Sequence, residues 1–179
     1  ARCRQNYFTE LRHTATDDIK TDAEEIKGVP SHHRGSIGSS KSPRYHTAST
    51  MSTKTPINTT EAPKALPGIY NQAIVANGLV FCSGVVALDS NTMKIKEGDV
   101  KAHTHDIIKN LSVILEAAGT TIDRAVKVNV FLSNMEDFAA MNEVYMQYWG
   151  DVKPCRTCVA VKTLPYNTDV EIECTAILP

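Results

Sequence analysis

The sequence has few of the features that mark membrane, secreted or nucleic-acid-binding proteins. Its 19 Lys and Arg residues nearly balance its 20 Asp and Glu residues, whereas a protein held to nucleic acid by charge carries a basic excess. No run approaches the ~18 consecutive apolar residues that a membrane-spanning helix needs, and no early stretch resembles a secretion signal. Five irregularly spaced cysteines do not form a disulfide framework. We therefore predict a soluble globular protein of a reducing compartment, with no membrane or nucleic-acid partner.

Large apolar side chains are also scarce at the N-terminal end. Residues 1–50 of the 179 contain only six large aliphatic or Phe side chains, namely Phe8, Leu11, Ile19, Ile26, Val29 and Ile37. This segment has a charge of +2, whereas residues 51–179 have a charge of −3. So little apolar surface cannot offset the entropy that a chain loses on folding. We predict a disordered tail over residues 1–50 and a folded domain over residues 51–179.

The tail has a partial targeting signal. From Ile26 to Thr50 it contains basic residues and no acid, which resembles a mitochondrial transit peptide, although five acids between residues 17 and 25 do not fit that pattern. A solvated tail, or an artificial extension ahead of a natural start at Met51, remains an alternative. The expected location is the mitochondrial matrix if the tail is a transit peptide, and the cytoplasm otherwise.

The folded domain begins with a hairpin signal and contains a strongly alternating strand. Residues 71–75 and 79–83 are apolar runs that flank Asn77-Gly78, the strongest short-range indication of a β-hairpin. Residues 125–132 alternate with period two, which is typical of a strand. One face of that strand is predicted to carry Val126, Val128, Val130 and Leu132.

Two segments have helical periodicity. Asp99 can cap a helix that runs to about Ala118, with Gly119 as its C-terminal stop. Its apolar stripe is predicted to contain Ile107, Leu111, Ile114 and Ala118. Ser133 and Glu136 form a capping-box pattern for a second helix that ends at Gly150. That helix is predicted to carry Phe138, Met141, Tyr145 and Tyr148.

The chain ends in two more alternating runs, residues 156–163 and 169–177, separated by a five-residue loop. We predict that they pair as an antiparallel hairpin. One face would then carry Arg156, Cys158, Ala160, Glu171 and Glu173, opposite Thr157, Val159, Val161, Val170 and Ile172. In that register Arg156 and Glu171 lie on the order of 20 Å apart. We therefore predict that different subunits contribute them to one site, unless the register differs.

The order of these elements indicates an α+β domain with a mixed sheet and two helices on one face. The other face must then meet solvent or another subunit. Its mixture of apolar, acidic and basic residues favours an oligomer interface with a polar pocket at its edge.

Three features could support chemistry. Arg156 suits bidentate capture of a small carboxylate, although a surface ion pair is the alternative. Glu171 is a candidate general acid or base if burial raises its pKa, and otherwise an ordinary solvated strand residue. Cys155 and Cys158 form a CxxC pair, but further zinc ligands at matching spacing are missing. We predict no metal site.

Six motifs then occur in order between about residue 55 and the C-terminus: Gly68-Ile69-Tyr70-Asn71-Gln72-Ala73, Cys82-Ser83-Gly84, Leu115-Glu116-Ala117-Ala118-Gly119, Asp137-Phe138-Ala139-Ala140-Met141-Asn142-Glu143-Val144-Tyr145, Arg156-Thr157-Cys158-Val159-Ala160-Val161 with Leu164-Pro165, and Val170-Glu171-Ile172-Glu173. Together they resemble the signatures of the Rid family of reactive enamine and imine deaminases, and most of all its RidA subgroup.

This resemblance implies a chorismate-mutase-like fold, a homotrimer with clefts between subunits, and no cofactor. It implies hydrolysis of 2-iminobutanoate and 2-iminopropanoate to 2-keto acids and ammonia, which protects pyridoxal-phosphate enzymes and supports branched-chain amino-acid metabolism. Arg156 would hold the substrate carboxylate and Glu171 would position or activate water. The remaining pocket residues would be Tyr70, Ser83, Gly84, Asn142, Thr157 and Cys158.

Three positions depart from the family pattern, and they bear on substrate preference more than on fold. Ile69 replaces a usual Pro, Val85 a common Gln, and His103 stands where Gln is frequent. Relatives have also been described as translation inhibitors with ribonuclease activity and as chaperone-like holdases. Those two functions remain alternatives, although the acidic domain without a basic stripe weakens the first.

Overall fold

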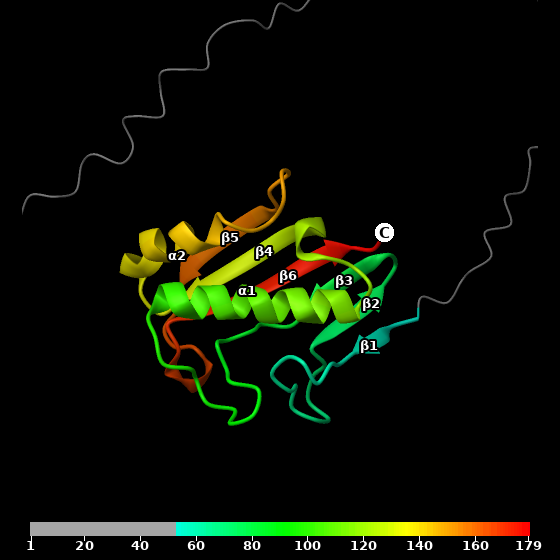
Figure 1. Cartoon of the computed structure of the whole chain (residues 1–179), viewed down its shortest axis with the longest axis horizontal. Coiled ribbons are helices and arrows are strands. Elements are labelled where there is room, and N and C mark those ends of the chain that lie inside the picture. The colour runs from blue at the N-terminus through cyan, green and yellow to red at the C-terminus, as the bar shows by residue number, and fades with distance from the viewer. Residues whose placement is uncertain (1–52) are drawn as a thin grey trace, which may run out of the picture. The chain divides into compact units, whose positions relative to one another are not determined.

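A computed structural model describes residues 53–179 of the chain, and the predicted tail with its targeting signal lies outside these residues. Six strands form one mixed sheet in the order β1-β2-β3-β6-β4-β5. The strands are β1 (Thr55–Ile57), β2 (Ala73–Ala76), β3 (Leu79–Cys82), β4 (Ala125–Leu132), β5 (Cys155–Ala160) and β6 (Val170–Ile177), and the helices are α1 (Val100–Ala117) and α2 (Phe138–Tyr145). Both helices cover the same face of the sheet (Figure 1). The predicted α+β architecture is confirmed.

The hairpin between β2 and β3 forms as predicted. Val75 pairs with Val80 and Ala76 with Leu79, so the loop consists of Asn77 and Gly78. These two residues have φ angles of 51° and 75°. Two consecutive residues with positive φ define the tight turn that matches the twist of the flanking strands, which is why Asn-Gly is favoured there.

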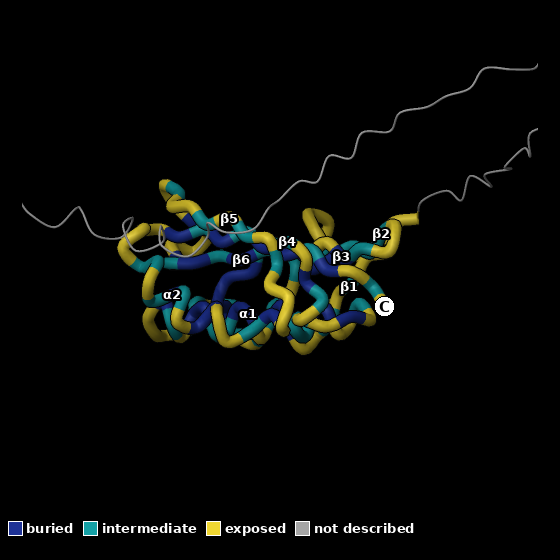
Figure 2. The backbone as a smooth tube through the Cα atoms, turned by 90° about the horizontal axis from the view of Figure 1, so that it is seen from above, coloured by how far each residue is buried: buried dark blue, intermediate teal, exposed yellow. Residues whose placement is uncertain are grey.

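Helix α1 also follows its sequence signals. The Asp99 side chain accepts a hydrogen bond of 3.0 Å from the backbone N–H of Ala102, which satisfies one of the free donors of the first turn. The helix ends at Ala117, and Gly119 has a φ of 87°. The predicted stripe is buried or, at Ala118, partly buried against the sheet (Figure 2), so burial of apolar area anchors the helix.

The predicted alternation of β4 is right along most of the strand and wrong at its N-terminal end. Val128, Val130 and Leu132 are fully buried, but 41% of Val126 is exposed. The pairing of β4 with β6 shifts register between Ala125 and Lys127. Such a bulge places two successive residues against one partner and reverses the alternation, so Ala125 points inward instead.

Helix α2 begins and ends differently from its prediction. The N-cap residue of α2 is Asp137, not Ser133, and its side chain makes no capping hydrogen bond. Asn134 instead caps a 3₁₀ turn over Met135–Asp137 that comes before the helix, where its side chain accepts a 3.1 Å hydrogen bond from the backbone N–H of Glu136. The helix already ends at Tyr145, because the chain leaves the helical conformation before Trp149 and Gly150, whose φ angles are positive.

The last two strands do not form the predicted hairpin. Strand β5 pairs in parallel with β4, and β6 pairs antiparallel with the other edge of β4. Helix α2 provides the crossover that a parallel neighbour requires. Strand β4 therefore lies between the two strands, and the predicted register and its separation of Arg156 from Glu171 are wrong.

This pairing also changes the face on which Arg156 lies. Arg156 is in register with Val128, and residues in register point to the same side of a sheet. Val128 faces the helices, so Arg156 faces them too. Glu171 is in register with Phe131 on the opposite side. The prediction that Arg156 and Glu171 share a sheet face is therefore wrong.

The sheet face opposite α1 and α2, here called the open face, is only partly covered. Phe81 and Val159 lie on it with 45% and 42% of their surface exposed. Polar residues lie between them, and Asn129 donates a 2.7 Å hydrogen bond to Glu173. Within the described part of the chain, no helix is long and apolar enough to cross a membrane.

Candidate active site

Four of the predicted site residues line one cavity of about 270 Å³, here called the Glu171 pocket. Tyr70 and Ser83 flank the β2–β3 hairpin, Gly84 follows it, and Glu171 belongs to β6. The other wall is apolar and includes Val86, Leu88, Ile114, Pro165 and Tyr166. Lys64 and Gln72 also line the cavity, so its polar side chains are one carboxylate, one ammonium, one amide and three hydroxyl-bearing residues among hydrocarbon.

Close backbone packing fixes Gly84 beside Glu171. Val85 and Ile172 exchange two backbone hydrogen bonds of 2.9 Å and 3.0 Å. A Cβ atom added to Gly84 would lie 1.9 Å from Oε1 of Glu171, far inside van der Waals contact. A side chain at residue 84 would therefore require the Glu171 side chain to move, because the carboxylate occupies that space. The adjacent Ser83 hydroxyl donates a 2.7 Å hydrogen bond to the carbonyl of Asn71.

The environment of Glu171 favours its protonated form. Burial raises the pKa of this carboxyl above its ordinary value, and the nearby Glu173 carboxylate raises that pKa further. Both effects disfavour negative charge. Glu171 is therefore a stronger base than a solvated carboxylate, a property that proton transfer near neutral pH requires.

Arg156 belongs to a second cluster, formed with three residues of α2 and here called the Arg156 cluster. Its Nη1 donates a 2.5 Å hydrogen bond to Oδ1 of Asn142. The guanidinium carbon lies 4.6 Å from the ring centre of Tyr145 and 5.6 Å from that of Phe138. These three α2 residues follow one another at helical spacing and present one stripe to Arg156.

The Arg156 cluster offers a positive charge and no strong nucleophile. Burial raises the pKa of Tyr145 to about 12, and the Arg156 charge opposes that rise only in part. Burial likewise raises the pKa of the Cys158 thiol, against the same opposing charge. Both groups are neutral near pH 7, so carboxylate binding by the guanidinium is the chemistry that this cluster supports.

The structure separates these two groups within one subunit. Arg156, Asn142 and Cys158 lie on the helix side, and Glu171 lies on the open face. Thr157 lies on the open face as well, where its Oγ1 accepts a 2.9 Å hydrogen bond from Lys127. A single subunit therefore does not bring an acid or base to the arginine.

The two CxxC cysteines point to opposite faces of β5. Cys155 is in register with Lys127 on the open face, and Cys158 with Val130 on the helix face. They therefore cannot chelate one ion together. Among residues 53–179 no three His, Cys, Asp or Glu side chains gather as a metal site.

Sequence reasoning missed the aromatic support of Arg156 and the Pro165–Tyr166 wall of the Glu171 pocket. The first had a signal, because Phe138, Asn142 and Tyr145 recur at intervals of four and three residues on a predicted helix. The second had none, because loop residues reach a pocket only through the tertiary fold.

The fold and the two groups define a small α+β domain with an aromatic-stacked arginine on one side and a half-buried carboxylate in a separate pocket. The chain belongs to the family described as endoribonuclease L-PSP, which residues 59–178 match. The Rid resemblance of the sequence is thereby confirmed, because proteins with Rid names are among its relatives.

Two relatives illustrate the similarity. The chain is 48% identical over 130 residues to "Protein mmf1, mitochondrial" of Schizosaccharomyces pombe. The aligned region covers 71% of this chain and 78% of that protein. It is 39% identical over 143 residues to "Reactive Intermediate Deaminase A, chloroplastic" of Arabidopsis thaliana. That aligned region covers 78% of this chain and 76% of that protein.

Solved structures are similar over the same region. Yeast Mmf1 superposes with a TM-score of 0.68 at 37% identity, over 71% of this chain and 100% of that one. Escherichia coli TdcF with bound serine superposes with a TM-score of 0.65 at 34% identity, over 70% of this chain and 99% of that one.

Proposed function

We propose that this protein hydrolyses reactive 2-imino acids, among them 2-iminobutanoate and 2-iminopropanoate, to 2-keto acids and ammonia. The observation that carries the proposal is the Arg156 cluster, where one Nη1–H group binds Asn142. The guanidinium has five N–H donors in a planar fork, which suits a small carboxylate. A relative named for reactive-intermediate deamination and a similar structure with bound serine support the same reading.

A second copy of the chain is needed to complete this site. Arg156 and Glu171 lie on opposite sides of the sheet of one subunit, whereas a three-carbon or four-carbon acid must touch both. We infer a homotrimer with a chorismate-mutase-like fold, in which each cleft receives Arg156 from one subunit and Glu171 from its neighbour. The partly exposed apolar side chains of the open face, Phe81 and Val159, favour this face as the interface.

The chemistry follows from the two groups. Arg156 holds the substrate carboxylate and thereby orients the imine carbon. Glu171 takes a proton from a water molecule as the water oxygen bonds to that carbon, and the C=N double bond becomes a single bond. Glu171 then returns this proton to the nitrogen, which gives a carbinolamine. In a second transfer Glu171 moves the hydroxyl proton to the nitrogen as the C–N bond breaks, so that ammonia leaves and the oxygen forms the keto group. One water is consumed, no electrons are transferred, and the reaction needs no cofactor.

A coupled assay tests the proposal. Threonine dehydratase generates the four-carbon imine, and release of 2-ketobutyrate is followed with and without this protein. We expect acceleration by the wild type, loss of that acceleration in Arg156→Ala, and full acceleration by Lys109→Ala, which removes an exposed cation from α1. Release that the wild type does not accelerate, or that Arg156→Ala accelerates equally, would contradict the proposed activity.

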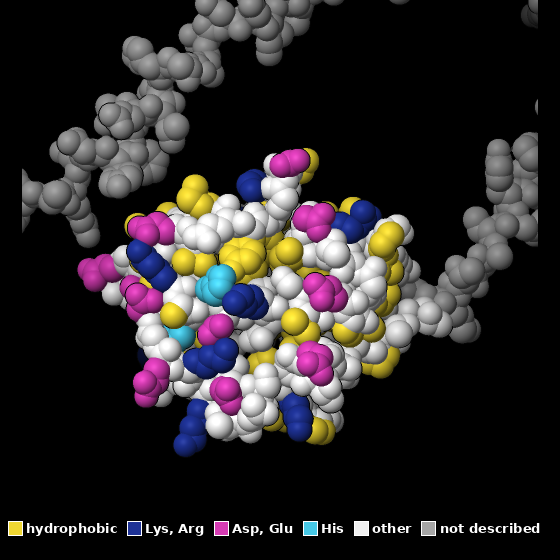
Figure 3. Space-filling model, in the orientation of Figure 1, with side chains coloured by type: hydrophobic (Ala, Val, Ile, Leu, Met, Phe, Trp, Pro, Cys, Tyr) yellow, Lys and Arg dark blue, Asp and Glu magenta, His cyan; other side chains and the backbone are white. Residues whose placement is uncertain are grey.

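The family description also names an endoribonuclease, but the described surface does not favour RNA. Lys and Arg side chains alternate with Asp and Glu over the helix side (Figure 3), and residues 51–179 have a net charge of −3. Binding to the phosphate backbone depends on concentrated positive charge. Imine hydrolysis therefore has stronger physical support than RNA cleavage, and nothing specific favours a holdase function.

We further propose that the protein works in the mitochondrial matrix, with the cytoplasm as the alternative. The support comes from two Schizosaccharomyces pombe relatives, mmf1 and mmf2, whose names call them mitochondrial. N-terminal sequencing of the protein isolated from mitochondria should give a start within or just after the tail. Recovery of the complete chain from the cytosol alone would contradict this location.

A further inference from the structure

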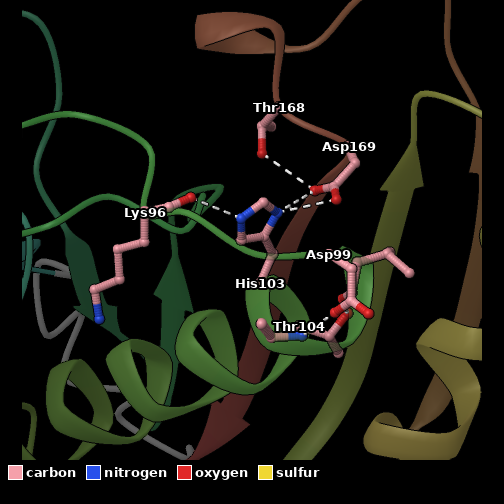
Figure 4. A network of polar contacts seen from close by, with 8 residues as sticks. Lys96, Asp99, His103, Thr104, Thr168 and Asp169 are labelled. Atoms are coloured by element: carbon pink, nitrogen blue, oxygen red, sulfur yellow. Dashed lines mark hydrogen bonds and ion pairs between the residues drawn. The ribbon is translucent and has the colours of Figure 1, made fainter.

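His103 joins α1 to two other segments of the domain. It lies at the end of the first turn of α1, and only 6% of its surface is exposed. Its Nδ1 lies 2.8 Å and 2.9 Å from the two carboxylate oxygens of Asp169, and its Nε2 lies 2.8 Å from the backbone carbonyl oxygen of Lys96 (Figure 4). One buried ring therefore contacts Asp169, the residue before β6, and Lys96 in the loop that leads into α1.

The partners of the ring fix its orientation. A carboxylate and a backbone carbonyl accept hydrogen bonds and donate none. The ring therefore lies between two acceptors, one at each nitrogen, and links the residue before β6 to the loop before α1.

The other charged groups around the ring are engaged elsewhere. The Lys96 ammonium pairs with Asp106 at 3.2 Å. The Asp99 carboxylate caps α1 through the N–H of Ala102. Among the described residues, the Asp169 carboxylate thus has His103 as its main partner, besides a weak 3.4 Å hydrogen bond from Thr168.

Asp169 ends a strained segment of the Glu171 pocket. Residues 164–169 include Pro165 and Tyr166, which line the cavity, and lead directly into β6 and Glu171. Tyr166 and Asn167 have φ angles of 56° and 52°, a left-handed conformation that Asn tolerates and that a bulky residue such as Tyr avoids. Such a segment keeps its shape only where its ends are held, and Asp169 is one of those ends.

The geometry points to His103 as a positioning residue that holds residues 164–169 and thereby the Tyr166 wall of the Glu171 pocket. The effect on turnover rests on the proposed deaminase function. The rigidity of the segment does not.

Hydrogen exchange and kinetics test the positioning role. His103→Gln should increase amide exchange over residues 164–169 at least tenfold at pH 6.5 and raise KM about fivefold with a smaller change in kcat, because the wall acts mainly in substrate binding. His105→Gln is the matched control, because it makes the same change two residues away on α1, and it should change neither quantity. Unchanged exchange in His103→Gln refutes the positioning role, whereas an inactive wild type with the expected exchange results refutes only the deaminase function.

Discussion

Gly84 and Glu171 are packed so closely that the Glu171 carboxylate occupies the place of a side chain at residue 84. A Cβ atom there would lie 1.9 Å from Oε1 and 2.9 Å from the carboxyl carbon. The clash involves only the side chain of Glu171. The absence of a side chain at Gly84 therefore allows the Glu171 carboxylate to lie where it does.

We predict that Gly84→Ala displaces Glu171. The substitution should lower kcat by roughly 10²-fold, the usual contribution of a placed acid or base, and the free energy of unfolding by about 1–3 kcal/mol through overpacking. Imine hydrolysis and chemical denaturation measure the two effects. The double variant Gly84→Ala/Glu171→Ala should regain stability but not activity. A double variant as unstable as Gly84→Ala would show that the strain lies in the backbone.

We predict that Glu171→Gln stabilises the domain and inactivates it. Burial and Glu173 raise the pKa of Glu171 in the folded state above its unfolded value. The folded protein therefore binds this proton more tightly, and stability is lost as pH rises from the unfolded pKa through the folded one. At pH 7 the neutral amide avoids that loss, so Tm should rise. At low pH the two proteins should have the same Tm. A lower Tm for the variant at pH 7 would be the contrary result.

The pH profile of activity should respond to Glu173. Activity requires ionised Glu171, so the acid limb of the kcat profile should lie above the ordinary pKa of a glutamate. Glu173→Gln removes a negative charge that raises the pKa of Glu171, and the limb should move to lower pH. Asn129 loses its carboxylate partner in this variant, so Asn129→Ala serves as the control and should leave the limb in place. An unmoved limb in Glu173→Gln would mean that another group controls the profile.

Tyr145 should support Arg156 through its ring and not through its hydroxyl. Tyr145→Leu removes the ring 4.6 Å from the guanidinium carbon and should raise KM roughly threefold to thirtyfold, the range of a cation–π contact. Tyr145→Phe keeps the ring and deletes a buried hydroxyl that has no hydrogen-bond partner among the described residues. Its KM should stay unchanged and its Tm should not fall. Equal KM values for the two variants would contradict this role.

A mixing experiment tests whether two subunits share each site. Arg156→Ala and Glu171→Gln should each be inactive alone. Refolded together in equal amounts, they should form mixed trimers in which roughly a quarter of the sites combine an intact arginine from one subunit with an intact glutamate from another. Activity should therefore return on mixing. Mixtures that form trimers but remain inactive would place both residues of each site in one subunit.

Local sequence signals predicted the elements whose structure depends on neighbouring residues. Asn77-Gly78 specified the first hairpin and Asp99 with Gly119 bounded α1, because turns and caps are decided within a few residues. The core face of β4 followed from its alternation. The exposed Val126 did not, because a bulge depends on how two distant strands pair.

The same distinction between local and non-local determinants applies to the candidate site. The sequence by itself determined which side chains carry the chemistry, since the guanidinium of Arg156 and the carboxyl of Glu171 have their properties wherever they lie. Tertiary structure decided that β4 separates β5 from β6, and hence that Arg156 joins α2 while Glu171 packs on Gly84. Strand order is a property of non-local pairing, because the same alternating pattern fits an antiparallel hairpin and a parallel crossover equally well.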